Sequence, residues 1–367
     1  MILAGNIGST NSLLGVFKGG EKEPLVKKEF PGKNYSSLEL LVEEFLQELS
    51  LDEPIYSACF GIGGPVKNGT GNIRSLSWNI VDKNMCALLM RLCWKVDDNS
   101  LCENQATRMP VEVINNLGAV DFNNLEPTEL VDINPNSKQP EEESDHFRQN
   151  RAWIAPKTGL GEALFCWDRY EKRFRPLATE GGHADFAPRN PLEDELLGFL
   201  RQHFKPVVAC QRVLSRLGLS YIYQFFKAKN GATGLAALDE LIKQKDSVQA
   251  TTVLIEAALK KENAECVQAL GMFVSILGAE TGNLALKHLA LGGVYVGGPI
   301  ALEIVDKLQD GIFMKAFKQR EVQDIVELMD SIPIMVVTNP DIRFQGIAKR
   351  AFRKEGMGIV IHNKVVT

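Results

Sequence analysis

The chain has 367 residues, of which 45% are hydrophobic and 24% charged, and its 41 Lys and Arg against 46 Asp and Glu give a net charge of −5. A chain this long exceeds the usual size of a single hydrophobic core, so we expect two domains. The slightly acidic charge balance argues against a nucleic-acid partner held by a basic face.

The seven cysteines are scattered and form no C-x-x-C pair. This pattern is typical of reduced thiols and favours neither a disulfide framework nor a structural zinc site. The start "MILAGNIGST" has no basic leader, and no uninterrupted run reaches the ~18 apolar residues of a membrane span. We therefore expect a soluble, cytoplasmic protein.

The first part of the chain is predicted to form strands followed by one helix. Residues 1–5 and 12–18 flank "GNIGSTN" as a candidate hairpin, and "EPLVKKEF" predicts a third strand. Apolar residues then recur at helical spacing from Leu38 to Leu49, and Ser36 with Glu39 resembles a capping box at the helix start.

Two further apolar strands are predicted, at 55–66 ("IYSACFGIGGPV") and 111–114 ("VEVI"). The second delivers Asn115 and Asn116 at its C-terminal end. The ends of strands in α/β sheets are where ligands bind, so this pair is a candidate site before any family is considered.

A change of composition follows. Residues 127–150 are polar and acidic without periodicity, which predicts an exposed acidic flap. Strands are then expected at 152–155, "EALFCWD", 292–298 and 332–337. Helices are expected at 191–204, 219–228, 233–245, 249–259 and 263–289, and a final amphipathic helix at 343–354 with its charges in solvent. Two similar α/β halves are conceivable, although their sequences match poorly.

Glycine-rich turns occur at 5–11, 157–161 and 292–298. One such turn after a strand is more often only a turn, but three of them, two with threonines, favour a nucleotide cleft.

The string "TEGGHADFAPRN" (179–190) gathers Glu180, His183 and Asp185. It fits a loop that binds polyol hydroxyls, with a purely structural histidine as the alternative, and no ligand spacing supports a metal.

Read in order, the strings "LAGNIGSTNSLLGVF", "GIGGPVKNG", "VEVINN", "TGLGEA", "EGGHADFAPRN", "RVLS", "GAETGNLALK", "GGVYVGG" and "NPD" resemble the bacterial-type glucokinase family from Leu3 to about Asn363. The zinc-binding cysteine signature of the related repressor-and-kinase family is absent. The resemblance implies an α/β, actin-like (ribonuclease H-like) two-domain kinase fold with a ligand cleft between the domains. It implies a small domain of 1–117 plus about 341–367, a large domain of 118–340, and a homodimer that uses ATP, Mg²⁺ and glucose or a related hexose.

Carried over position by position, the resemblance assigns sugar binding to Asn115, Asn116, Glu180, His183 and Gln211. Asn116 stands at the position of the catalytic base, and Asn6 at the position that manages Mg²⁺ and phosphate. The resemblance assigns nucleotide binding to three turns: Gly5, Asn6, Gly8, Ser9, Thr10 and Asn11; Lys157, Thr158, Gly159 and Gly161; Gly297 and Gly298.

The departures from the family pattern share one character. Asn6 and Asn116 replace aspartates and Gln211 replaces a glutamate, so each keeps acceptor oxygens but deletes charge, while Lys157 adds bulk and a positive charge at the second turn. The sequence therefore predicts a catalytically impaired ATP-dependent glucose kinase with doubtful Mg²⁺ binding. Residual activity would use Asp185 or Glu180 as the base, acting through water. The alternative is a non-enzymatic sugar-binding or regulatory pseudokinase.

Overall fold

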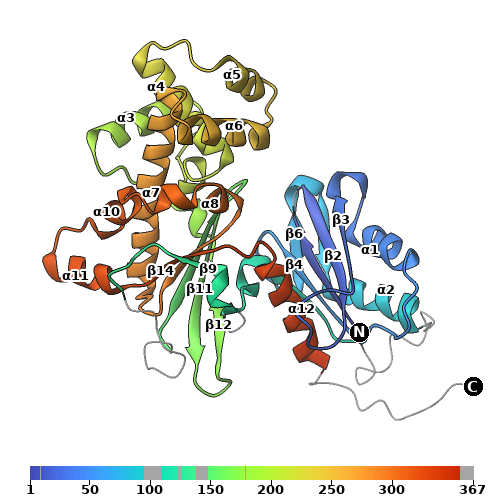
Figure 1. Cartoon of the computed structure of the whole chain (residues 1–367). Coiled ribbons are helices and arrows are strands. Elements are labelled where there is room, and N and C mark those ends of the chain that lie inside the picture. Colours follow the sequence, from blue (N-terminus) through green and yellow to red (C-terminus); the bar gives the residue numbers. More distant parts are fainter. Residues whose placement is uncertain (9, 95–108, 123–124, 138–147, 178, 356–367) are drawn as a thin grey trace, which may run out of the picture. The chain divides into compact units, whose positions relative to one another are not determined.

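The computed structural model describes the chain except residues 9, 95–108, 123–124, 138–147, 178 and 356–367 (Figure 1). The protein divides into two compact units. Unit 1 comprises Met1–Asn124 and Asp341–Thr367, and unit 2 comprises Leu125–Pro340. Both are mixed α/β structures, so the C-terminal segment returns to complete the unit that the N-terminal segment begins.

Unit 1 is built on a five-stranded sheet in the order β3-β2-β1-β4-β8. Its strands are β1 (Ile2–Ile7), β2 (Asn11–Phe17), β3 (Val26–Pro31), β4 (Ser57–Ile62) and β8 (Val111–Asn115). The predicted hairpin and third strand are confirmed, since β1, β2 and β3 pair antiparallel. β1, β4 and β8 run parallel, which brings their C-terminal ends to one edge of the sheet.

Helices cover both faces of this sheet. They are α1 (Leu38–Gln47), α2 (Asp82–Trp94) and α12 (Ile342–Glu355), with the short 3-10 turns η1 (Gly32–Asn34), η2 (Arg74–Leu76) and η5 (Asn116–Ala119) and a small sheet of β5 (Val66–Lys67), β6 (Thr70–Ile73) and β7 (Trp78–Val81). Side chains of α1 and α2 share one apolar cluster with the sheet, and those of α12 share a second. The cap of α1 differs from the prediction, because Ser37 rather than Ser36 precedes the helix and accepts from Leu40 N.

The sequence predicted that the charged side chains of α12 lie in solvent, but two of them are paired and partly buried instead. Arg350 donates to both carboxylate oxygens of Glu112 on β8, at 2.8 and 2.6 Å. Lys349 lies 2.6 Å from Asp121 Oδ2. Both cations are half-buried and tie α12 to the segment that carries Asn115 and Asn116, which the helical pattern alone could not indicate.

Unit 2 contains a six-stranded sheet in the order β12-β11-β10-β13-β14-β9. Its strands are β9 (Leu130–Asp132), β10 (Arg151–Pro156), β11 (Leu160–Asp168), β12 (Arg173–Leu177), β13 (Val294–Val296) and β14 (Ile334–Val337). β9 lies within the segment predicted to be an exposed flap. After the turn η7 (Pro127–Glu129), it pairs antiparallel with β14 because its backbone groups complete the edge of the sheet, whereas 138–147 lie outside the described residues.

The two sheets share one arrangement. In each, a strand turns through a glycine-rich loop into an antiparallel partner, a third antiparallel strand follows, and two parallel strands extend the other side. The similarity of the two halves, which the sequences barely suggest, is therefore a similarity of topology.

The helices of unit 2 are α3 (Pro191–Leu200), α4 (Arg216–Asn230), α5 (Ala236–Lys243), α6 (Ser247–Leu259), α7 (Ala264–His288), α8 (Pro299–Glu303), α9 (Val305–Leu308), α10 (Ile312–Lys318) and α11 (Gln323–Ser331), with the 3-10 turns η8 (Gly181–His183) and η9 (Cys210–Arg212). α7 is the long central helix in Figure 1. By length and composition it could cross a membrane, although no uninterrupted apolar run suggested one. Of its most apolar 18-residue stretch 78% is buried inside the structure, as expected of a core helix.

Gly346 allows α12 to pack against η5. A Cβ atom at this position would lie 1.6 Å from the carbonyl oxygen of Ala119. We expect Gly346→Ala to lower the free energy of unfolding by about 1–3 kcal/mol, because the helix must move away from η5. Denaturant titration measures the change. The matched control is Gly198→Ala in α3, where a Cβ meets nothing within 4 Å. That change should raise stability by up to about 1 kcal/mol, and equal effects of the two substitutions would contradict the packing argument.

Candidate functional site

The turn between β1 and β2 keeps the form expected of a phosphate loop. Gly8 N donates to Asn11 O at 3.1 Å, and a Cβ on Gly8 would lie 2.6 Å from that oxygen. Gly5 is buried and Asn6 is partly buried near the end of β1, and Thr10 and Asn11 are exposed. Ser9 lies outside the described residues. The turn therefore offers backbone, a hydroxyl and an amide at its surface, with no charged side chain among its described members.

The parallel strands bring Asn6 and Asn116 together. Asn6 aligns with Gly61 of β4, and Gly61 aligns with Ile114 of β8, just before the Asn115-Asn116 pair. Asn116 Nδ2 donates to Asn6 Oδ1 at 3.1 Å, across 110 positions of sequence. Asn116 is 9% exposed. The two amides predicted to stand at the base and Mg²⁺ positions are thus hydrogen-bonded to each other.

Both the oxygen and the nitrogen of the Asn115 side-chain amide form hydrogen bonds within unit 1. Its Oδ1 accepts from Leu117 N at 2.9 Å and so caps η5, while its Nδ2 donates to Gly64 O at 2.9 Å. An amide has two acceptor lone pairs and two N–H groups. One of each remains available, and the two hydrogen bonds fix the orientation of the side chain.

A divalent cation does not fit the residues at these strand ends. Mg²⁺ is held by carboxylate oxygens together with water and phosphate. Asn6 and Asn116 supply no charge, and the Oδ1 of Asn6 already accepts a hydrogen bond from Asn116 Nδ2. Among the described residues there is no group of three or more His, Cys, Asp or Glu side chains that could hold a metal ion.

In unit 2, the second predicted phosphate turn lies between β10 and β11. Lys157 N donates to Gly159 O at 2.7 Å, and Lys157 O accepts from Arg216 N at 2.9 Å. The Lys157 and Thr158 side chains are exposed. A Cβ on Gly159 would lie 2.7 Å from Gln211 Oε1, so the turn packs directly on a residue assigned to sugar binding.

The sugar-binding candidates of unit 2 form one group. Gln211 Nε2 lies 3.1 Å from His183 Nδ1, and His183 Nε2 lies 4.0 Å from Glu180 Oε2. The His183 and Glu180 side chains are 64% and 51% exposed. Asp185 is also exposed, and its backbone bridges to Ala209. The structure therefore brings Glu180, His183 and Gln211 together beside Gly159.

The third glycine turn follows β13. Gly297 is buried, and Gly298 has a φ of +91°, a conformation that favours glycine, immediately before α8 begins at Pro299. Gly161, the remaining candidate, lies in β11 opposite Ala155. Gly297 and Gly298 thus form the tight turn from β13 into α8 that the sequence assigned to nucleotide binding.

Glu162 is a residue that the sequence reasoning did not single out. It follows Gly161 on β11, is 4% exposed, and its Oε1 has no hydrogen-bond partner in the described part of the chain. Burial raises the pKa of this carboxyl to about 7, with a further increase from Glu280 and an opposing effect of Lys287. The available signal was a charged residue at the start of the otherwise apolar "EALFCW".

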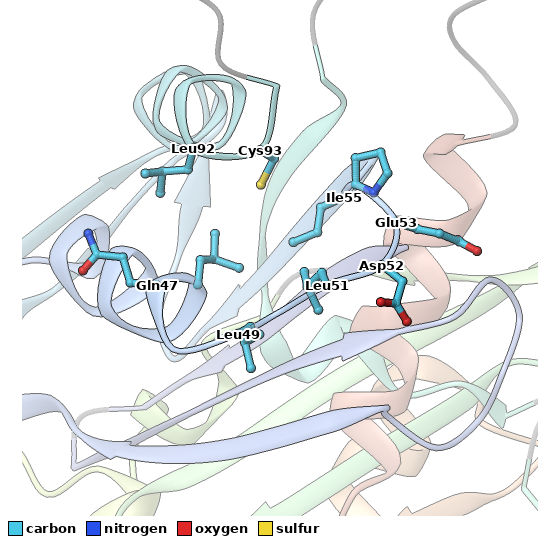
Figure 2. A pocket seen from close by; sticks show the side chains of 10 residues that line it. Gln47, Leu49, Leu51, Asp52, Glu53, Ile55, Leu92 and Cys93 are labelled. Carbon is cyan, nitrogen blue, oxygen red and sulfur yellow. The ribbon is translucent and has the colours of Figure 1, made fainter.

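A surface pocket of about 430 Å³ lies elsewhere in unit 1, between the ends of α1 and α2 (Figure 2). Leu49, Leu51, Ile55 and Cys93 contribute to its lining, and Asp52 and Glu53 are also among its residues. None of the candidate sugar or nucleotide residues lines it. This pocket is not part of the candidate site.

Comparisons with known proteins agree on one family. A family model described as Glucokinase matches residues 3–92 and 87–354. The chain is 28% identical to a glucokinase of Nostoc punctiforme (96% of this chain, 99% of the relative) and 30% identical to one of Synechocystis (94% and 96%). A glucokinase structure from an Antarctic psychrotroph is 25% identical with a TM-score of 0.70, covering 96% of this chain and 98% of the other. The glucose complex of Balamuthia mandrillaris glucokinase matches at 14% identity and a TM-score of 0.75, covering 95% and 93%.

The contact between Asn6 and Asn116 predicts how carboxylates would behave there. In Asn6→Asp/Asn116→Asp, two negative charges would meet where the amides now share a hydrogen bond, which raises one carboxyl pKa above its unfolded value. We expect each single variant to be tolerated and the pair to show an unfavourable coupling of about 1–3 kcal/mol at pH 8.

Because that pKa is raised in the folded state, the coupling is absent at pH 4 and appears as the pH rises. Added Mg²⁺ should reduce it at pH 8. Denaturant titrations of the four proteins of the cycle measure the coupling. Additive effects at pH 8 would contradict the contact.

Proposed function

This chain belongs to the glucokinase family, and on that premise we propose that it binds a hexose but phosphorylates it with ATP poorly or not at all. Its fold is the actin-like two-domain fold of glucokinase and ROK sugar-kinase structures. The single observation that carries the proposal is the hydrogen bond between Asn116 and Asn6.

The first loss concerns the general base. Phosphoryl transfer to a sugar needs a group that orients the attacking hydroxyl and takes its proton. The amide of Asn116 cannot accept a proton at neutral pH, and its Nδ2 donates to Asn6. A positioned general base contributes roughly 10²–10⁴ in rate, so the absence of one at this position lowers turnover by about that factor.

The second loss concerns metal-assisted charge neutralisation. The transferred phosphoryl group depends on Mg²⁺ to offset the charge that develops on its oxygens. Asn6 holds no negative charge for the cation, and its Oδ1 accepts from Asn116. The losses act on different parts of the reaction, deprotonation and charge neutralisation, and we expect them to compound.

Sugar binding depends on groups that remain. Asn115 is oriented by two hydrogen bonds, and Glu180, His183 and Gln211 form one exposed group in unit 2. Hydroxyl recognition requires donors and acceptors rather than net charge. The glucose complexes of the Balamuthia glucokinase and of a Streptomyces griseus ROK glucokinase, the latter also with AMPPNP, suggest glucose or a related hexose and ATP as ligands.

Two uses of the site follow from these features. A sugar-binding or regulatory pseudokinase is favoured because the two amides satisfy each other without a cation. A slow kinase would need another base, and the exposed carboxylates of Asp185 and Glu180 are the candidates, acting through water. The effect of Asp185→Asn separates the two, since it removes residual turnover only if Asp185 serves as that base.

A coupled assay of ADP release with glucose tests the impaired chemistry. We expect Asn6→Asp/Asn116→Asp to turn over roughly 10²-fold or more faster than the natural chain, because base and metal position are restored together. The control Asn34→Asp/Asn72→Asp adds the same charge at exposed positions of unit 1 and should give no gain. Turnover by the natural chain at ordinary kinase rates, about 1–100 s⁻¹, would refute the proposal.

A further inference from the structure

Glu162 lies directly beneath the turn that carries the candidate sugar ligands. A Cβ added to Gly181 would lie 1.9 Å from Glu162 Oε2. Gly182 packs equally closely on the same strand, since its Cβ would lie 2.1 Å from Leu160 O. Gly181 begins η8, which ends at His183, and Glu180 precedes it. The carboxyl of Glu162 is thus part of the surface on which the sugar-binding turn rests.

Two charged groups of α7 act on this carboxyl, and others lie on the elements around it. From α7, Glu280 raises its pKa and Lys287 lowers it. Glu280 is itself buried and accepts from Asn283 Nδ2 at 2.9 Å. Glu162 and Glu280 help to raise the pKa of Cys210 on η9 to about 12, chiefly a result of burial, with Lys287 and Asp185 as smaller influences. The turn itself carries Glu180 and His183.

The neutral form of Glu162 suits this environment. A buried carboxylate without hydrogen bonds is strongly destabilised, and the nearby charge of Glu280 adds repulsion. Oε1 has no partner among the described residues. With its pKa raised to about 7, the group changes charge close to neutral pH rather than far below it.

We propose that Glu162 is a positioning residue for the sugar-binding turn, whose neutral carboxyl supports Gly181–His183 and whose ionisation weakens hexose binding. The inference rests on the proposed hexose-binding function. When the carboxyl loses its proton to solvent, the new charge is repelled by Glu280 and attracts water. Either response displaces the turn that packs against Oε2.

The direction of the pH dependence follows by linkage. If the hexose binds the form in which Glu162 is neutral, binding is strongest below the pKa and weakens as the pH rises through about 7. Glu162→Gln keeps the shape of the neutral acid and cannot ionise. Its affinity should therefore match that of the natural chain at low pH and stay constant as the pH rises.

Isothermal titration with glucose from pH 5.5 to 8.5 tests the inference. We expect the dissociation constant of the natural chain to rise roughly threefold or more across this range, and that of Glu162→Gln to change much less. The profile of Glu162→Gln is the reference for every other contribution to the pH dependence. Equal pH profiles for the two proteins would overturn the role of Glu162.

Two further variants test the direction of the effect without altering Glu162. Lys287→Met, at an exposed position, should move the loss of affinity to higher pH, and Glu280→Gln should move it to lower pH. The exposed control Glu262→Gln should leave the profile unchanged. Shifts in the opposite directions would contradict the electrostatic account.

The same titrations separate this inference from the proposed function. Glucose binding that is present but independent of pH overturns only the role of Glu162. Absence of glucose binding at every pH overturns both, while unfolding measured without sugar still reports whether Glu162→Gln folds.

Discussion

The hydrogen bond between Asn116 and Asn6 is the interaction on which the proposed function of unit 1 rests. Three parallel strands end side by side, and their register leaves these positions in contact whatever residues occupy them. Two carboxylates there would need a cation or a shared proton, because like charges at hydrogen-bond distance destabilise each other. Two amides need neither. The residues at these strand ends therefore require no metal, and the two side chains at the proposed Mg²⁺ and base positions are hydrogen-bonded to each other.

The candidate groups of unit 2 are held by close packing rather than by charge pairs alone. Gln211 approaches Gly159, and Glu162 approaches Gly181, each where a larger residue would clash. These contacts link the second glycine turn to the sugar-binding turn within one unit. They also explain why an uncharged amide at position 211 is compatible with hydroxyl recognition, since its contacts with His183 and Gly159 need shape and a donor, not a negative charge.

The sequence predicted the local elements well because each has its own signal. The hairpin around Gly8, the helix beginning at Leu38 and the long helix ending at His288 follow from turn chemistry and apolar spacing. The family and the identity of the candidate ligands came from ordered motifs. The membership is confirmed, while the roles of these residues stay predictions.

What the sequence could not provide were contacts set by strand register and packing. Asn6 and Asn116 were each recognised as departures, but nothing in a linear pattern shows that their amides meet. β9 escaped prediction because a three-residue edge strand inside a polar segment is stabilised by its partner β14 rather than by a pattern of its own. The burial of Glu162 depends on Gly181, α7 and the sheet together, so its charge read as ordinary surface charge.

The dependence of nucleotide binding on Mg²⁺ tests the central claim most directly. A non-hydrolysable ATP analogue is titrated into the natural chain with glucose present, once with Mg²⁺ and once with EDTA. Because the amides of Asn6 and Asn116 are hydrogen-bonded to each other and offer no carboxylate, we predict weak binding with the same dissociation constant in both conditions. Binding that is about tenfold or more tighter with Mg²⁺, a difference of about 1.4 kcal/mol, would show that the chain still organises the metal and would contradict the account.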